Sequence, residues 1–223
     1  MRISHLAATA ASVVLLAACA APERRAASAP STLPPVLQEA IVQTVPEPMP
    51  AAVGAFERIR RLAPDLDPGV LAPALEARAC ALRNHEVGDD AKLAVIDYSR
   101  PSTQKRLWVF DMARDALLFH EHVAHGSGTG DNLARRFSNE DGSHATSLGL
   151  FRTAETYQGG NGYSLRLDGL DAGFNDRARS RAIVMHGAWY VNPDLIRTQG
   201  RLGRSQGCPA LREQVAKVVI DTL

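Results

Sequence analysis

The segment 183–211 constrains the fold of this chain most, because the chemistry it implies requires two separated residues to meet. An apolar run ends at His186-Gly187, and Gly207-Cys208 follows with the cysteine twenty-two positions after the histidine. A cysteine attacks as its thiolate, so it needs a base within hydrogen-bond reach or positive surroundings that lower the pKa of the thiol. The spacing predicts a fold that returns Cys208 to the strand ending at His186.

The residues around the cysteine favour an activated thiol in a sharp turn. Gly207 permits a backbone bend closed to other residues, and Pro209 fixes the angle that follows. We expect this turn to aim the thiol outward and to leave the Gly207 and Cys208 amides free to stabilise an oxyanion. Positive charge is supplied by four arginines in a stretch without acidic residues: Arg197, Arg201, Arg204 and Arg212.

A structural interpretation of the pair also exists, in which Cys208 is an inert buried thiol and His186 a satisfied core histidine. Free cysteine is among the most buried residue types, so a lone Cys-His pair often has this character. Here the pair belongs to a larger pattern, His186-Gly187 followed by Ser205-Gln206-Gly207-Cys208.

This pattern resembles the L,D-transpeptidase catalytic domain, the YkuD-type fold, and most closely its murein L,D-transpeptidase branch. The family has a His-Gly, a spacer, and then Ser/Thr-His-Gly-Cys. This chain has a slightly longer spacer, Gln206 in place of the second histidine, and Pro209-Ala210 in place of the usual tail. The likeness covers residues 91–211 and includes the run SLRLDGLDAGFNDRARSRAIVMHG.

The resemblance implies a cysteine acyltransferase acting on peptidoglycan stem peptides. Cys208 would be the nucleophile and His186 the base. Gly207, Ser205 and Gly187 would shape the loop and the oxyanion site. A thioester with the third residue of a tetrapeptide stem would form as D-alanine leaves, and an amine of a neighbouring stem would resolve it into a 3-3 cross-link. Two alternatives remain: a hydrolase of the L,D-carboxypeptidase or amidase type with the same site, and a non-catalytic peptidoglycan-binding envelope lipoprotein.

Four side chains are candidates for contact with the stem peptides: Arg204, Gln206, Arg166 and Tyr157. Arginine pairs bidentately with a carboxylate, and stem peptides carry several. For Arg166 and Asp168 a structural ion pair is the alternative. The turn-rich segment 139–149 resembles the family's Thr-Pro-x-Gly segment at Thr146-Ser147-Leu148-Gly149 and would line one wall of the cleft, with a plain hairpin loop as the alternative.

Hydrophobic periodicity predicts a mainly β domain, a β-sandwich or open barrel with N-terminal helices and a C-terminal covering helix. Residues 89–223 form the expected L,D-transpeptidase-like catalytic domain, and 51–88 form a helical segment packed on it. The expected strands are 92–98, 105–112, 116–124, 147–152, 163–167 and 181–186. Helical spacing marks 53–62, 70–85, 193–198 and 211–221, and Asp67-Pro68 provides a helix N-cap with proline at the first position.

The N-terminus has the features of a secretory leader. Residues 1–19 combine Arg2, an apolar run and Leu-Ala-Ala-Cys, which resembles the lipobox of bacterial lipoproteins and makes Cys19 the expected lipidation site. The alternative is ordinary cleavage that discards Cys19. Residues 20–50, rich in Ala, Pro, Ser and Thr, are an expected tether. We therefore expect a membrane-anchored protein of the periplasm or cell envelope.

Net charge, histidine spacing and cysteine content limit the partners and cofactors expected for the chain. A net charge of +1 argues against a nucleic-acid footprint over the whole chain. His120-Glu121-His122 with His125 could hold zinc, but no Cys or His pair elsewhere completes a recognisable spacing, so we expect no metal and no cofactor. Cys80 is expected to be a buried, reduced helix residue, because a bond to Cys208 would abolish the nucleophile.

Overall fold

The computed structural model describes residues 50–89 and 92–223, and the side chains from residue 54 onward in its first helix. The expected leader, the lipidation site Cys19 and the tether up to residue 49 lie outside the described residues. None of the described helices has both the length and the hydropathy required to cross a membrane.

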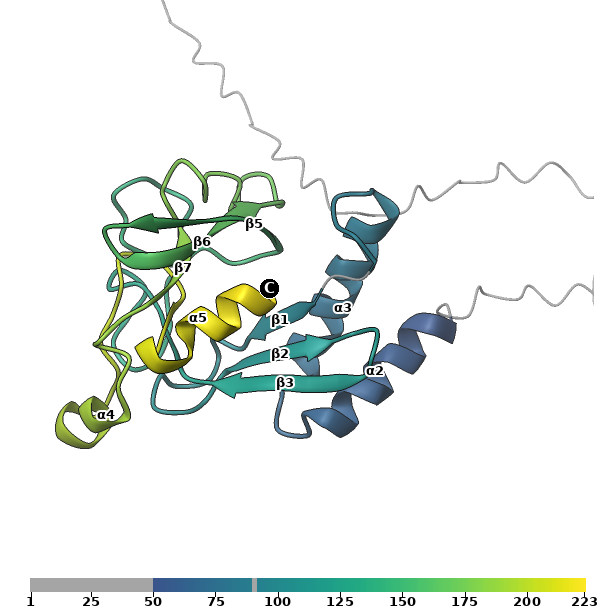
Figure 1. The fold of residues 1–223 in the computed structure, drawn as a ribbon, viewed down its shortest axis with the longest axis horizontal. Coiled ribbons are helices and arrows are strands. Elements are labelled where there is room, and N and C mark those ends of the chain that lie inside the picture. The colour runs from purple at the N-terminus through teal and green to yellow at the C-terminus, as the bar shows by residue number, and fades with distance from the viewer. Residues whose placement is uncertain (1–49, 90–91) are drawn as a thin grey trace, which may run out of the picture. The chain divides into compact units, whose positions relative to one another are not determined.

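Two sheets and four helices make up the described part of the chain (Figure 1). The three-stranded sheet has the order β1-β2-β3, and the five-stranded sheet has the order β4-β8-β7-β6-β5. The strands are β1 (Leu93–Ile96), β2 (Leu107–Asp111), β3 (Ala116–Glu121), β4 (Val123–Ala124), β5 (Phe151–Gly159), β6 (Gly162–Gly169), β7 (Val184–Gly187) and β8 (Ala210–Leu211). The helices are α2 (Pro50–Leu62), α3 (Pro68–Arg83), α4 (Pro193–Gln199) and α5 (Glu213–Thr222).

This architecture is mixed α/β rather than clearly mainly β, and the described strands form two open sheets rather than a closed barrel. The predicted N-terminal and C-terminal helices are present. Strand β5 is the main difference, because it runs to Gly159 where the sequence predicted a strand ending at residue 152. Its residues are mostly exposed or half-buried, so no regular alternation of apolar side chains marked it.

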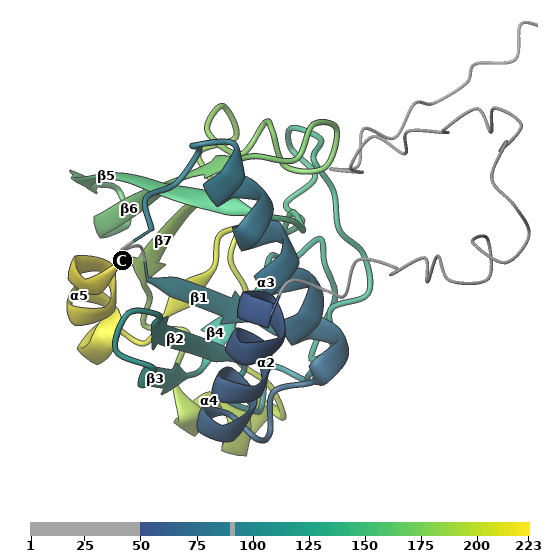
Figure 2. The ribbon, with the colours of Figure 1, turned by 90° about the vertical axis from the view of Figure 1, so that its right-hand side faces the viewer.

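Strand β2 explains how the helices are arranged, because both of its faces are buried. Leu107 and Val109 face a core that α5 shares with the five-stranded sheet, while Trp108 and Phe110 face α2 and α3. Figure 2 shows α2 and α3 on their side of the three-stranded sheet. Helix α5 therefore contributes to the core between the two sheets, rather than only covering one of them.

Helix α3 begins as the sequence predicts. The Asp67 side chain accepts a hydrogen bond from the Gly69 amide at 2.7 Å, and Pro68 occupies the first helical position. Near the end of this helix, Cys80 is 8% exposed and disulfide-bonded. Its predicted burial is confirmed, whereas the prediction of a reduced thiol is wrong.

Candidate active site

A parallel pairing brings the two ends of segment 183–211 together. β7 and β8 pair in parallel with His186 opposite Ala210. Cys208 lies two residues before Ala210, so the turn that contains it is held alongside β7. The amide of Val184 donates to Cys208 Sγ at 3.5 Å, which fixes the sulfur beside the start of this strand.

Cys208 and His186 line the same cavity, of about 640 Å³. The other lining residues come from the 141–144 segment, the β5–β6 turn, the 180–182 turn, the strand end and the cysteine loop: Asp141, Gly142, His144, Asn161, Ser180, Arg181, Ala182, Tyr190, Arg204, Ser205 and Gln206. The sulfur-bearing residue is 8% exposed and the histidine 4% exposed. The fold therefore brings both residues to one cavity, although no hydrogen bond joins them in the described part of the chain.

The histidine is oriented by its own neighbour. His186 Nδ1 lies 2.9 Å from the Gly187 carbonyl oxygen, which can only accept, so Nδ1 carries the proton in this arrangement. Nε2 is then the basic nitrogen. Among the described residues no group hydrogen-bonds to Nε2, which leaves it available to a proton donor in the cavity.

The thiol and the imidazole are both neutral at rest. Burial raises the pKa of Cys208, opposed by the Val184 amide and by the positive charge of Arg181. Burial lowers the pKa of His186, opposed by the hydrogen bond to Gly187. The thiol points its proton at the Ala182 carbonyl oxygen, 3.6 Å from Sγ, rather than at His186. Proton transfer from Cys208 to His186 thus requires the thiol to rotate away from the Ala182 carbonyl.

The four arginines expected to activate the thiol are paired with carboxylates instead. Arg197 lies 2.7 Å from Asp194, and Arg212 lies 2.7 Å from Glu121. Both Arg201 and Arg204 approach Asp131, at 3.9 and 3.0 Å. The segment 197–212 itself lacks acidic residues. The fold brings Asp131 and Glu121 to three of the arginines, and Arg197 pairs with Asp194, three residues upstream.

The arginine that does act on the thiol is Arg181, which the sequence reasoning missed. It lines the cavity, and its NH1 and NH2 groups donate to four oxygens of the 138–147 segment at 2.6–3.1 Å. These acceptors are two backbone carbonyls and two serine hydroxyls, so they leave the positive charge unneutralised by direct contact. No local pattern in the sequence marked Arg181, because its position near the thiol depends on the fold of the 180–182 turn, where the Ala182 carbonyl accepts the hydrogen bond of the thiol.

Tyr190 is a second residue that the sequence reasoning missed. It follows His186 by four positions and lines the same cavity. Burial raises its pKa to about 12, with a smaller contribution from Cys208, so the phenol stays protonated. Its hydroxyl is therefore a hydrogen-bond donor at neutral pH.

Ser205 organises the cysteine loop as predicted. Its hydroxyl donates to the Cys208 carbonyl at 2.7 Å and accepts from the Gly207 amide at 3.1 Å. The Gly207 amide is consequently not free for an oxyanion, which corrects the expectation for this residue. Within the described part of the chain, the Cys208 amide has no hydrogen-bond partner, so it is the amide of the two that remains available.

Glycine is required at two positions of the site. Gly207 has φ of +120°, and a Cβ there would lie 2.9 Å from both the Ala145 carbonyl oxygen and Ile183 Cδ1. A Cβ on Gly187 would lie 3.0 Å from Ala216 Cβ, so the glycine after His186 permits the close approach of α5.

The four candidates for substrate contact divide into two groups. Arg204 and Gln206 line the cavity. Arg166 and Tyr157 are not among its lining residues and contact each other, with the guanidinium 4.3 Å from the ring centroid. Arg166 also lies 3.0 Å from Glu155, and Asp168 is paired with Arg152 and Arg179. The structural ion-pair interpretation therefore describes this face of β5 and β6.

The segment 139–149 does form one wall of the cavity, through Asp141, Gly142 and His144. Thr146 lies beneath the cysteine loop, where its hydroxyl donates to the Gly207 carbonyl at 3.1 Å and accepts from the Gly126 amide at 2.9 Å. The family-like part of the segment thus supports the loop that carries Cys208.

The histidine-rich stretch after β2 is engaged in structural contacts. His120 stacks on Trp108, with ring centroids 4.7 Å apart, and Glu121 pairs with Arg212. His125 accepts at Nδ1 from the buried Arg106 at 2.7 Å. Across residues 50–89 and 92–223, no three His, Cys, Asp or Glu side chains converge in a way that could hold a metal ion.

A cysteine and a histidine that share a cavity at the end of a β-strand define a class of site suited to acyl transfer through a thioester. The family model of the L,D-transpeptidase catalytic domain matches residues 62–223. The chain therefore belongs to the L,D-transpeptidase family of YkuD-type catalytic domains. No curated protein and no solved structure matches it.

Proposed function

We propose that this protein is a cysteine acyltransferase that joins peptidoglycan stem peptides through a Cys208 thioester. The observation that carries the proposal is the cavity that Cys208 and His186 line together, with His186 Nδ1 engaged by Gly187 so that Nε2 is the basic nitrogen. Membership of the L,D-transpeptidase family supports the substrate class. The unpaired Cys208 amide supports the expected stabilisation of an oxyanion.

In the first step, His186 Nε2 takes the proton of Cys208 and the thiolate attacks the carbonyl carbon of the third stem residue, a diamino acid. The resulting oxyanion accepts a hydrogen bond from the Cys208 amide. The C–N bond to D-alanine breaks, the proton on His186 passes to the leaving amine, and a thioester remains.

In the second step, an amine of another stem attacks the thioester. His186 accepts a proton from the attacking nitrogen, the C–S bond breaks, and the proton returns to the sulfur. Water in place of the amine would make the same site a hydrolase. Gln206 lines the cavity where the family pattern has a second histidine, and its amide can bind substrate but cannot exchange a proton.

Intact-mass spectrometry of the full chain with a tetrapeptide stem tests the proposal. The wild-type chain should gain the mass of the stem minus D-alanine. Cys208→Ala should gain none, and His186→Ala should gain it about 10²- to 10⁴-fold more slowly, as loss of a general base typically causes. Wild-type adduct levels in either variant would refute the assignment. Dimers indicate transfer, trimmed monomers indicate hydrolysis, and a wild-type chain that binds the stem without an adduct would indicate the non-catalytic binder.

We also propose that the protein is a lipoprotein of the cell envelope, anchored through Cys19 and extended by the tether 20–50. The support is the lipobox-like sequence at the end of the leader. Metabolic labelling with a fatty acid should mark the wild-type chain and not Cys19→Ser, whereas equal labelling of both would exclude lipidation at this residue.

A further inference from the structure

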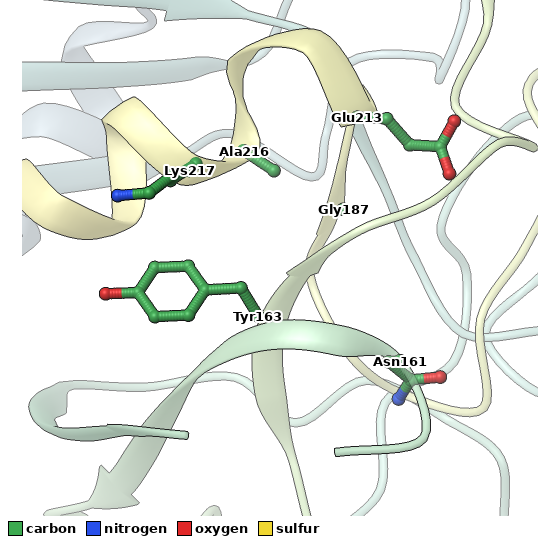
Figure 3. Close-up of a pocket in the computed structure, with 6 residues that line it drawn as sticks. All are labelled: Asn161, Tyr163, Gly187, Glu213, Ala216 and Lys217. Carbon is green, nitrogen blue, oxygen red and sulfur yellow. The ribbon is translucent and has the colours of Figure 1, made fainter. Parts of the chain in front are cut away.

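A second groove of the molecule lies on the face of β6 and β7 that α5 covers, away from the nucleophile. Its volume is about 180 Å³, and Figure 3 shows Ala216 and Lys217 of α5 across it from Tyr163 of β6. Among the described residues that line this groove, Asn161 alone also lines the cavity of Cys208. The contacts that hold the cysteine turn on the cavity side come from another part of the chain, the segment 123–127.

The segment 123–127 holds the cysteine turn at both of its ends. Just after the turn, β4 pairs with β8. Just before it, the Ser205 amide donates to the His125 carbonyl at 3.0 Å, and the Ser205 carbonyl accepts from the Ser127 amide at 2.8 Å. The Ser205 hydroxyl in turn donates to the Cys208 carbonyl. The position of Cys208 therefore depends on the position of this segment.

Arg106 is the side chain that fixes the segment 123–127. It lies directly before β2 and is fully buried, and its Nε and Nη2 groups donate to the Val123 carbonyl at 3.1 and 3.0 Å. Nη2 also donates to His125 Nδ1 at 2.7 Å, and Nη1 donates to the Arg100 carbonyl at 2.8 Å. The guanidinium thus contacts the segment at a backbone carbonyl and at a side chain two residues further on.

His125 accepts this hydrogen bond because its ring is neutral. Burial and the positive charge of Arg106 lower the pKa of His125 to about 4. Its Nε2 lies 3.3 Å from the Gly130 carbonyl oxygen, which can only accept, so Nε2 carries the proton and Nδ1 has a free lone pair. The imidazole therefore links Arg106 to the residue whose backbone carbonyl binds Ser205.

The burial of a guanidinium at this position indicates a specific role. The four hydrogen bonds of Arg106 go to two carbonyl oxygens and an imidazole nitrogen, and none goes to a carboxylate in the described part of the chain. Burial lowers the pKa of Arg106 to about 10, so the group remains charged at neutral pH. A hydrophobic side chain would fill the same space without the cost of burying a charge, but it would leave the Val123 carbonyl and His125 Nδ1 without this donor.

We propose that Arg106 and His125 are positioning residues for the nucleophile, which hold the segment 123–127, and through it the turn from Ser205 to Cys208, against β7. This inference rests on the proposed acyl transfer. Neither side chain lines the cavity, so neither touches the substrate. A displacement of about 1 Å at a reacting group can slow a reaction about 10²-fold. It would also move the sulfur away from the Val184 amide, whose hydrogen bond lowers the pKa of the thiol.

Comparison of His125→Leu with His125→Asn in the full chain tests the proposal. Leucine removes the acceptor at Nδ1, whereas the side-chain oxygen of asparagine can take its place. At a saturating concentration of a tetrapeptide stem, His125→Leu should form the adduct about 10- to 10²-fold more slowly than the wild type, and His125→Asn should recover to within about threefold. Arg106→Lys keeps the charge but loses the forked donor geometry, so it should be slowed as His125→Leu is.

Leu71→Ala is the matched control for loss of stability. Leu71 is fully buried in the core cluster of α2, α3 and β2, which is separate from the cluster that contains Val123. This variant should unfold more easily and still form the adduct within about twofold of the wild-type rate, because the two sites share no partner.

Alkylation of Cys208 by iodoacetamide as a function of pH is a second measurement, which does not depend on the stem. The titration midpoint of the thiol should rise in His125→Leu and Arg106→Lys and return toward the wild-type value in His125→Asn. The proposal is overturned if His125→Leu matches Leu71→Ala in both measurements, or if His125→Asn is as slow as His125→Leu. Should His125→Leu fail to fold, a wild-type rate and midpoint in Arg106→Lys would overturn it equally.

Failure of the proposed function has a different signature. The wild-type chain then forms no adduct with a tetrapeptide stem, while the alkylation of Cys208 still separates His125→Leu and Arg106→Lys from Leu71→Ala.

Discussion

Replacement of Arg181 should raise the pKa of the Cys208 thiol and slow its reaction with electrophiles. Arg181 adjoins Ala182, whose carbonyl oxygen lies 3.6 Å from the sulfur. Two unit charges on the order of 8 Å apart attract by about 2 kcal/mol at an effective dielectric constant of about 20. Solvent in the open cavity should reduce the effect of Arg181 to about 1 kcal/mol, which corresponds to a roughly fivefold loss of thiolate at a given pH in Arg181→Gln.

The assay is the rate of Cys208 alkylation by iodoacetamide as a function of pH, with the adduct located by peptide mass spectrometry. Arg181→Lys keeps the charge but loses the forked contacts to the 138–147 segment, so it should lower the free energy of unfolding while leaving the pKa near its wild-type value. Arg197→Gln is the control, because Arg197 is paired with Asp194 outside the cavity.

Two results would refute this reasoning about Arg181. The first is a titration midpoint in Arg181→Gln within about 0.2 units of the wild type, since the electrostatic effect would then be negligible. The second is an equal rise of the Cys208 titration midpoint in Arg181→Lys and Arg181→Gln. An equal rise would mean that the positioning of the 138–147 segment, and not the charge, controls the thiol.

Three further predictions concern the support of the site. Ser205→Ala removes two buried hydrogen bonds and should lower the free energy of unfolding by about 2–3 kcal/mol, as measured by chemical denaturation. A loss below about 0.5 kcal/mol would contradict the role given to this hydroxyl. Gly207→Ala would place a Cβ at a residue with positive φ, 2.9 Å from two neighbouring atoms. It should lower the free energy of unfolding by about 2–4 kcal/mol and abolish adduct formation. Wild-type adduct levels would show that the turn tolerates a side chain. Burial and the charge of Arg106 lower the pKa of His125 to about 4, so its stabilising contribution of up to about 3 kcal/mol is complete above pH 6.5 and is lost as the pH falls toward 4. Denaturation midpoints measured between pH 6.5 and 4 should fall with pH more steeply in the wild type than in His125→Asn. Equal slopes in the two proteins would contradict the role given to His125.

The sequence predicted the elements that carry local signals. The strand that carries His186, the two strands on either side of residues 113–115 and the capped start of α3 are all present. Each follows from information within a few residues, such as an apolar run, a turn or a capping side chain. That Cys208 and His186 reach one cavity was predictable, because both residues belong to the paired motifs that resemble the family pattern.

The charge environment of the site was not predictable from neighbouring residues. The stretch 197–212 contains four arginines without an acidic residue, yet Asp131 and Glu121 reach three of them from distant parts of the chain. Arg181, the charge that lies beside the cavity, precedes Cys208 by twenty-seven positions. Such pairings depend on the register of β7 with β8 and on the position of α5, which local patterns do not specify.

A neutral resting pair changes how catalysis must begin. The reference pKa of a thiol exceeds that of an imidazole by about 2 units, and burial of both residues widens the gap, so transfer of the proton from Cys208 to His186 costs more than about 3 kcal/mol in the empty site. Arg181 and the Val184 amide recover part of this cost. In the proposed reaction the bound donor supplies the rest. Its carbonyl oxygen becomes negative as the thiolate attacks, and the Cys208 amide would stabilise that oxyanion. The same burial keeps the thiol protonated between turnovers, and a protonated thiol is a poor target for oxidants and electrophiles. We therefore expect the thiol to react slowly with alkylating agents at neutral pH and faster with a stem peptide.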